Sequence, residues 1–376
     1  LHLFVDPEAP VKVAHLRLEN TTGEQRRITA TYYAELVLGV NRSQSSPYII
    51  PEYEEQNCAL LFRNPYSVEF GRRVAFIAGS TEPHGVTTDR TEFLGRLGSI
   101  AAPAALDRIG LSGRVQVGLD PCAALQLHID LPPNGVQEVY FLIGQGSDRQ
   151  EALALIERFQ STEAVEATWR AARAHWDEIL ETVTVETPDP AMNLLLNRWL
   201  LYQALSCRIW GRSALYQSSG AYGFRDQLQD SMALIQARPD LVREQILRAA
   251  RHQFEAGDVL HWWHPPGGQG VRTRITDDLL WLPYVTAHYV AATGDHGILH
   301  EEVPFLQGMP LAADEEERYA QYEATEAVSC LYNHCLRALR KGTTAGVHGI
   351  PLMGAGDWND GMNRVGIEGA GESIWL

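Results

Sequence analysis

Lysine and cysteine are both scarce in this chain. Only Lys12 and Lys341 are lysines, so a mechanism centred on a lysine has few candidates. The five cysteines are an odd number and form no Cys-x-x-Cys pair, which argues against a disulfide framework and against a cysteine zinc site. This thiol usage is typical of a reducing compartment.

Several functional signatures are missing as well. The chain has no run of about 18 apolar residues, which a membrane-spanning helix needs, and no nucleophile-elbow, P-loop or dinucleotide-binding motif. Its formal net charge of −16 repels nucleic-acid phosphates and anionic lipids. We therefore expect no nucleic-acid partner and no direct insertion of this chain into a membrane. Residues 1–10 contain no initiator Met and no signal core, and the chain stops after a glycine-rich loop, so we interpret it as a piece of a longer protein.

The residues that are present indicate two domains, which suits a length of 376 residues. Period-two alternation and β-branched residues predict strands at 11–18, 28–38, 125–129 and 138–143. These strands predict an N-terminal antiparallel β-sandwich over residues 1–146. Residues 147–188 predict a helical linker, with one helix capped by Ser147 and a second over Trp169–Leu180.

The segment 189–376 has apolar residues at helical spacing. It predicts helices from Met192, from Pro239, over 277–293 with Gly294 as the C′ glycine, and over 322–339. Loops rich in Gly, aromatic and acidic residues are expected at 217–230, 261–278 and 346–375. Helices that alternate with such loops indicate a toroid of helical hairpins, only part of which fits in the residues available.

The segment 354–363 contains two carboxylates that bracket a tryptophan and an asparagine. Trp358 offers a flat apolar face for a sugar ring, and Asp357, Asn359 and Asp360 offer groups for its hydroxyls. If both carboxylates point into one site, repulsion and burial favour the protonated form of one, which is what a departing glycosidic oxygen needs. The alternative is a helix start with Asp357 as the N-cap, which the segment taken alone favours.

Two further segments suggest carbohydrate binding. Arg225 and Asp226 are adjacent, and if a helix starts there both can reach vicinal hydroxyls of one ligand; a buried ion pair between domains is an equal alternative. The adjacent Trp262 and Trp263 lie in a Pro/Gly loop, a pattern typical of sugar platforms. The loop ends in the acidic pair 277–278.

The acidic pair allows other interpretations. Thr276, Asp277 and Asp278 also suit a helix cap. A metal site that joins them to His261 and His264 is the weakest interpretation, because His-x-x-His without a helix is a poor metal signal. Of these interpretations we favour contact with a sugar, and we expect no metal.

Together the three segments resemble the glycoside hydrolase family 94 phosphorylases of the cellobiose phosphorylase type. The sequence motifs at 223–230 and 357–360 carry the resemblance. The sequences of the segments 274–283 and 353–375 are closest to the phosphorylase region of cyclic β-1,2-glucan synthases. The resemblance spans nearly the whole chain. It implies that residues 189–376 are the first part of an (α/α)6-barrel, incomplete in this chain. It also implies a cytoplasmic location, in the cytosolic region of a larger inner-membrane protein, and is compatible with a homodimer.

The resemblance implies roles for the site residues as well. Asp360 corresponds to the general acid, Trp358 lines the donor-sugar site, and Arg225 with Asp226 binds the donor hydroxyls. Inorganic phosphate is the co-substrate and attacks the anomeric carbon, so no cofactor and no second carboxylate base are required. The implied products are α-glucose 1-phosphate and a shortened β-glucan.

Two departures and two alternatives accompany this resemblance. Ser219 stands where cellobiose-type members have a phosphate-binding arginine, and the remaining phosphate ligands are expected beyond Leu376, so we expect the chain alone to bind phosphate poorly. An inverting hydrolase with Asp226 or Asp277 as the base is one alternative function. A non-catalytic carbohydrate-binding module is the other.

Overall fold

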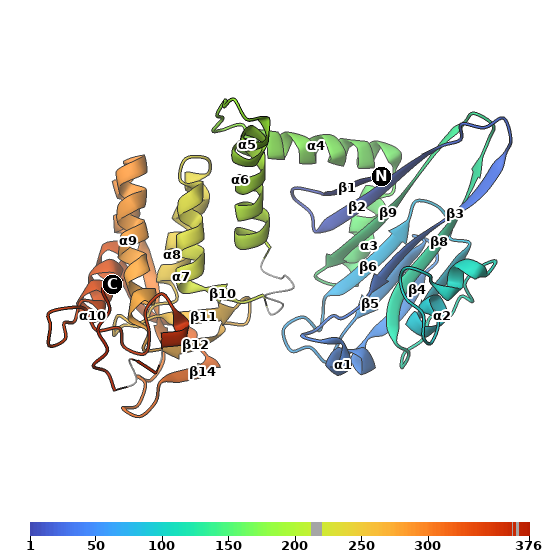
Figure 1. The fold of residues 1–376 in the computed structure, drawn as a ribbon. Helices are drawn as coiled ribbons and strands as arrows, with labels where there is room; N and C mark the ends of the chain where they lie inside the picture. Colours follow the sequence, from blue (N-terminus) through green and yellow to red (C-terminus); the bar gives the residue numbers. More distant parts are fainter. Residues whose placement is uncertain (212–219, 363, 366–367) are drawn as a thin grey trace. The chain divides into compact units, whose positions relative to one another are not determined.

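The computed structural model describes residues 1–211, 220–362, 364–365 and 368–376, which form two compact units, Leu1–Asp177 and Glu178–Leu376 (Figure 1). The first unit is an antiparallel sandwich, as the sequence predicts. Its larger sheet has the order β1-β2-β9-β6-β5-β4 and its smaller sheet the order β3-β8-β7. The strands are β1 (His2–Val5), β2 (Val11–Glu19), β3 (Arg26–Glu35), β4 (Ile50–Glu54), β5 (Ala59–Arg63), β6 (Val74–Gly79), β7 (Gly85–Asp89), β8 (Pro121–Leu131) and β9 (Val136–Gly146).

Both faces of the larger sheet are covered. Side chains such as Leu60 and Phe62 face Leu125 of β8 and form the core between the sheets. The opposite face packs against α3 (Arg149–Phe159) and α4 (Thr162–Leu180), whose apolar residues share a core with β2, β5, β6 and β9. The helices predicted as a linker therefore belong largely to the sandwich unit, because their apolar stripe needs the sheet for burial. Two short helices, α1 (Arg42–Ser45) and α2 (Arg90–Leu94), interrupt the strands.

The second unit is mainly helical in the regions where the sequence predicts helices. A helical run begins at α5 (Pro190–Leu194) and continues through α6 (Leu200–Gln203) and two π-helical turns to Ile209. It is followed by α7 (Phe224–Ser231), α8 (Pro239–Ala250), α9 (Thr276–Thr293) and α10 (Leu331–Gly342). Gly294 ends α9 in the left-handed conformation, with φ of 73°. No helix in the described part of the chain is both long and apolar enough to cross a lipid bilayer.

Three predicted elements of this unit differ from the structure. The expected loop at 217–230 ends in the helix α7. The expected helix over 322–339 begins as a strand, β15 (Glu323–Cys330), which pairs with β13 (Glu302–Gln307) before α10 starts. The expected loop at 261–278 contains a hairpin of β11 (Leu260–His264) and β12 (Gln269–Thr273). This hairpin lies between β10 (Tyr222–Gly223) and β14 (Glu317–Gln321) in one sheet. The strand β15 depends on a partner outside the predicted segment, and the local hairpin is flanked in its sheet by two strands from elsewhere in the sequence.

Candidate functional site

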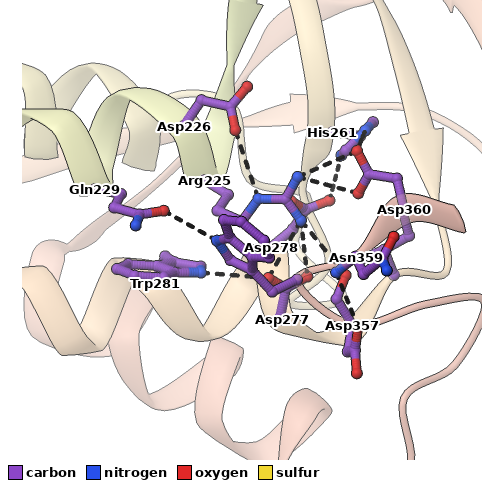
Figure 2. Close-up of polar contacts among 12 residues, drawn as sticks. Arg225, Asp226, Gln229, His261, Asp277, Asp278, Trp281, Asp357, Asn359 and Asp360 are labelled. Atoms are coloured by element: carbon purple, nitrogen blue, oxygen red, sulfur yellow. Dashed lines mark hydrogen bonds and ion pairs between the residues drawn. The ribbon is translucent and has the colours of Figure 1, made fainter. Parts of the chain in front are cut away.

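Arg225 is the centre of a cluster of carboxylates in the second unit (Figure 2). It lies in the first turn of α7, and its side chain is 8% exposed. Nη2 donates to both carboxylate oxygens of Asp360, at 3.0 and 3.2 Å, while Nη1 donates to Asp277 Oδ2 at 3.3 Å. Nε lies 3.5 Å from Asp226 Oδ1. One guanidinium thus links three carboxylates from three segments.

Local backbone geometry brings these segments together. A Cβ on Gly223, the N-cap of α7, would lie 2.6 Å from Asp226 Oδ2, so glycine makes room for that carboxylate. Gly354 has φ of 63°, and a Cβ there would lie 1.9 Å from the carbonyl oxygen of Arg274. The loop that leads to Asp360 can therefore run directly against the start of α9.

Asp277 and Asp278 occupy the first turn of α9, where the helix N-terminus favours negative charge. Neither is the N-cap, because Ile275 holds that position without a side-chain cap. Asp277 also accepts a hydrogen bond from Trp281 Nε1 at 3.3 Å. Burial, followed by the charge of Asp278, raises the pKa of Asp277 to about 6 against the opposing effect of Arg225.

Asp278 is fully buried and pairs with His261. Asp278 Oδ2 accepts a hydrogen bond from His261 Nδ1 at 2.7 Å, and burial raises the pKa of this carboxyl. Burial alone would lower the pKa of His261, but the charge and hydrogen bond of Asp278, together with Asp360, raise it to about 9. His261 is therefore an imidazolium at neutral pH. No group of three or more His, Cys, Asp or Glu side chains among the described residues is arranged to hold a metal.

The loop around Trp358 presents one carboxylate to Arg225 rather than two. The Asp357 carboxylate accepts hydrogen bonds from the Asn359 backbone at 2.9 Å and from Ser373 Oγ at 2.7 Å, so it stabilises the loop. Only its carbonyl oxygen contacts Arg225, at 3.4 Å. Asn359 Oδ1 in turn accepts from the backbone of Gly361 at 3.0 Å. The condition that both carboxylates point into one site is therefore not fulfilled, because only Asp360 directs its carboxylate to Arg225.

The side chains of Trp358 and Asp360 in this loop remain open to solvent. Asp360 begins a short 3₁₀ turn, and its side chain is 52% exposed. Trp358 is 47% exposed, lies 5.9 Å from the Arg225 guanidinium, and donates Nε1 to Gln229 Oε1 at 3.1 Å. An exposed indole, a half-exposed carboxylate and a guanidinium therefore lie together, within reach of a polar ligand with an apolar face.

The adjacent tryptophans of β11 do not form an exposed pair. Trp263 is 2% exposed and stacks on His252 at a centroid distance of 3.7 Å. Trp262 is half-buried and contacts Tyr319 at 5.6 Å. Because residues next to each other in a strand face opposite sides, one indole enters the core and only the other retains exposed surface. Ser219, expected to replace a phosphate-binding arginine, lies outside the described residues.

Sequence reasoning missed three contributors to this cluster. His261 was considered only as a weak metal candidate. Trp281 and Gln229 lie in the segments that carry the family resemblance, but neither was assigned a role in the site. Trp281 lies four residues after Asp277 on α9, which is the spacing that brings helical side chains onto one face. Of these three contributors, only Trp281 could have been predicted from local spacing. The partners of His261 and Gln229 come from other segments, so local sequence does not indicate them.

Comparison with known proteins assigns the family. The chain matches the glycosyl hydrolase 94 supersandwich domain over residues 1–162 and the glycosyl hydrolase 94 superfamily catalytic domain over residues 175–376. It therefore belongs to the glycosyl hydrolase 94 family.

The relatives include one synthase and several phosphorylases. The cyclic beta-(1,2)-glucan synthase NdvB of Rhizobium meliloti (strain 1021) is 44% identical over 98% of this chain and 13% of that protein. The solabiose phosphorylase of Paenibacillus borealis is 27% identical over 99% of the chain and 45% of that protein. The N,N'-diacetylchitobiose phosphorylase of Vibrio proteolyticus is 25% identical over 97% of the chain and 47% of that protein. The chain thus spans less than half the length of each of these relatives.

Proposed function

We propose that this chain takes part in the inverting phosphorolysis of β-glucosidic bonds within a cyclic β-1,2-glucan synthase. The substrate would be β-1,2-glucan and the product α-glucose 1-phosphate. The observation that carries the proposal is the meeting of Arg225, Asp360 and Trp358 at one solvent-accessible site, in a chain 44% identical to a glucan synthase. These groups suit the hydroxyls and the apolar face of a sugar.

In this proposal Asp360 is the general acid. Its proton passes to the glycosidic oxygen as that oxygen leaves the anomeric carbon, while a phosphate oxygen bonds to the same carbon from the opposite face. Phosphate is already an anion, so the reaction needs no carboxylate base. Arg225 and Asp226 bind the donor hydroxyls, and a sugar that engages Arg225 leaves Asp360 facing the scissile bond. The helices of the second unit would form the first part of an (α/α)6 barrel on the cytosolic side of the larger protein.

The test is an assay of β-1,2-glucooligosaccharides with and without inorganic phosphate. It is run on this chain and on the Rhizobium meliloti synthase in which this chain replaces the matching segment, because the chain spans 13% of that protein. Glucose 1-phosphate is the readout, and proton NMR distinguishes its α anomer from its β anomer. Asp360→Asn removes the acid, and Asp314→Asn, at an exposed position, is the matched control.

Each outcome identifies one function. Phosphate-dependent α-glucose 1-phosphate that disappears in Asp360→Asn and persists in Asp314→Asn supports the proposal. Sugar release without phosphate means a hydrolase, and substitution of Asp226 or Asp277 then locates the base. Oligosaccharide binding without turnover in either protein means a non-catalytic binding module.

A further inference from the structure

His261 lies between two carboxylates, and the proposed reaction assigns it no role. Its Nδ1 donates to Asp278 Oδ2 at 2.7 Å, and its Nε2 lies 3.7 Å from Asp360 Oδ2. The imidazole side chain is 19% exposed, whereas Asp278 is 1% exposed. Figure 2 shows the ring beside Asp360. The ring thus connects a buried anion to the proposed acid.

The strand that carries His261 is irregular at this residue. Leu260 pairs with Arg272 and Trp262 pairs with Val271, so His261 is the extra residue of a bulge between β11 and β12. A bulge redirects the side chain of the extra residue out of the regular alternation, and bulges are enriched next to active sites. The backbone therefore directs His261 toward α9 and the Asp360 loop.

Asp278 determines which nitrogen of the His261 ring faces Asp360. Its Oδ1 atom is buried without a hydrogen-bond partner among the described residues, so His261 is its one side-chain hydrogen bond there. An anion buried in this way strongly favours a proton on Nδ1. The remaining nitrogen, Nε2, is the one that faces Asp360. The charged groups that face the ring are Asp278 on α9, Asp360 in its 3₁₀ turn and Arg225 on α7.

We propose that His261, oriented by Asp278, is a positioning residue for Asp360. This inference rests on the proposed role of Asp360 as the acid. When Asp360 loses its proton to the glycosidic oxygen, it becomes a carboxylate, and the imidazolium beside it stabilises that charge without transferring a proton. When Arg225 binds a sugar, its guanidinium is shared between the sugar and Asp360. His261 then helps to keep the carboxyl group of Asp360 in place.

The kinetic test compares three variants in the phosphorolysis assay. His261→Asn keeps an amide near Asp278 but places nothing at the position of Nε2, whereas His261→Gln returns an amide nearer to Asp360. His264→Asn, on the same strand, is the matched control. We expect His261→Asn to lower kcat about tenfold, equivalent to about 1.4 kcal/mol, with KM unchanged. His261→Gln should recover part of kcat, and His264→Asn should behave as the parent protein.

The pH profile separates positioning from mere packing. The parent should lose activity as pH rises through about 9, where His261 gives up its charge. His261→Asn should lack the alkaline limb near pH 9, and Asp278→Asn should move that limb to lower pH because the anion that holds the proton is gone. Loss of kcat with an unchanged alkaline limb in His261→Asn would overturn the proposal.

A measurement that needs no turnover keeps the two proposals separate. The ring of His261 is titrated by nitrogen NMR in this chain and in its Asp360→Asn variant, whose substituted side chain is half-exposed. A lower pKa of His261 in the variant demonstrates the coupling, even if no protein yields glucose 1-phosphate and the proposed function fails. An unchanged titration rejects the coupling, even in an active phosphorylase.

Discussion

Replacing Asp277 by asparagine should change how the stability of the second unit depends on pH. Asp277 is 3% exposed, and its pKa is about 6 in the folded chain, against about 4 in an unfolded chain. The folded chain therefore binds this proton more tightly, so the fold becomes more stable as pH falls through 6 and stops gaining below about 4. The ionised carboxylate of Asp277 therefore lowers the free energy of unfolding by about 3 kcal/mol at neutral pH.

The assay is urea unfolding followed by tryptophan fluorescence across this pH range. Of the nine tryptophans only Trp169 and Trp176 lie outside the second unit, so the signal reports mainly on that unit. Between about pH 5 and about pH 7.5 the free energy of unfolding of the parent should fall by about 1.5 kcal/mol relative to that of Asp277→Asn. The Asp314→Asn control should follow the parent. If the free energies of unfolding of the parent and Asp277→Asn change in parallel over this range, Asp277 does not titrate there and the burial argument is refuted.

Four further substitutions test the architecture around the site by chemical unfolding. Trp263→Ala should cost about 3–5 kcal/mol because it empties a core position, whereas Trp262→Ala should cost clearly less; equal costs would contradict the assigned burial. Gly354→Ala should destabilise the second unit by about 1–3 kcal/mol, since its Cβ would overlap the backbone of Arg274; a neutral result would mean that the loop moves aside without cost. Arg272→Gln should cost about 3–5 kcal/mol by leaving the buried Asp258 unpaired, and oligosaccharide binding by the folded fraction should be unchanged, because this pair lies outside the Arg225 cluster.

Much of the fold could be predicted because its elements have a strong local pattern. The alternation of Val11–Leu18 and the C′ glycine after α9 are visible in sequence, and the structure contains both. The segment 322–339 was misassigned because short apolar spacing suits a strand as well as a helix. Only the pairing of β15 with β13, some twenty residues earlier, decides for the strand, and no local window contains that information.

The candidate site could be predicted in its composition but not in its connections. Adjacent residues such as Arg225 and Asp226 identify the motif, yet the main partners of Arg225 are Asp277 and Asp360, which other loops supply. The bulge that aims His261 depends on the register between two strands. Burial of Trp263 beside half-buried Trp262 likewise depends on which side of the sheet is covered.

The bond from Arg225 to Asp360 spans 135 residues of chain, and that to Asp277 spans 52. Contacts of this separation form late, because a long loop must close before the contact is made. At ribosomal rates of about 5–20 residues per second, Arg225 is added to the chain about 7–27 seconds before Asp360. Asp226 and then Asp277 are made within that interval, so the cluster lacks Asp360 until its end. The Arg225 cluster is thus completed late in synthesis, and no peptide cut from one segment should reproduce it.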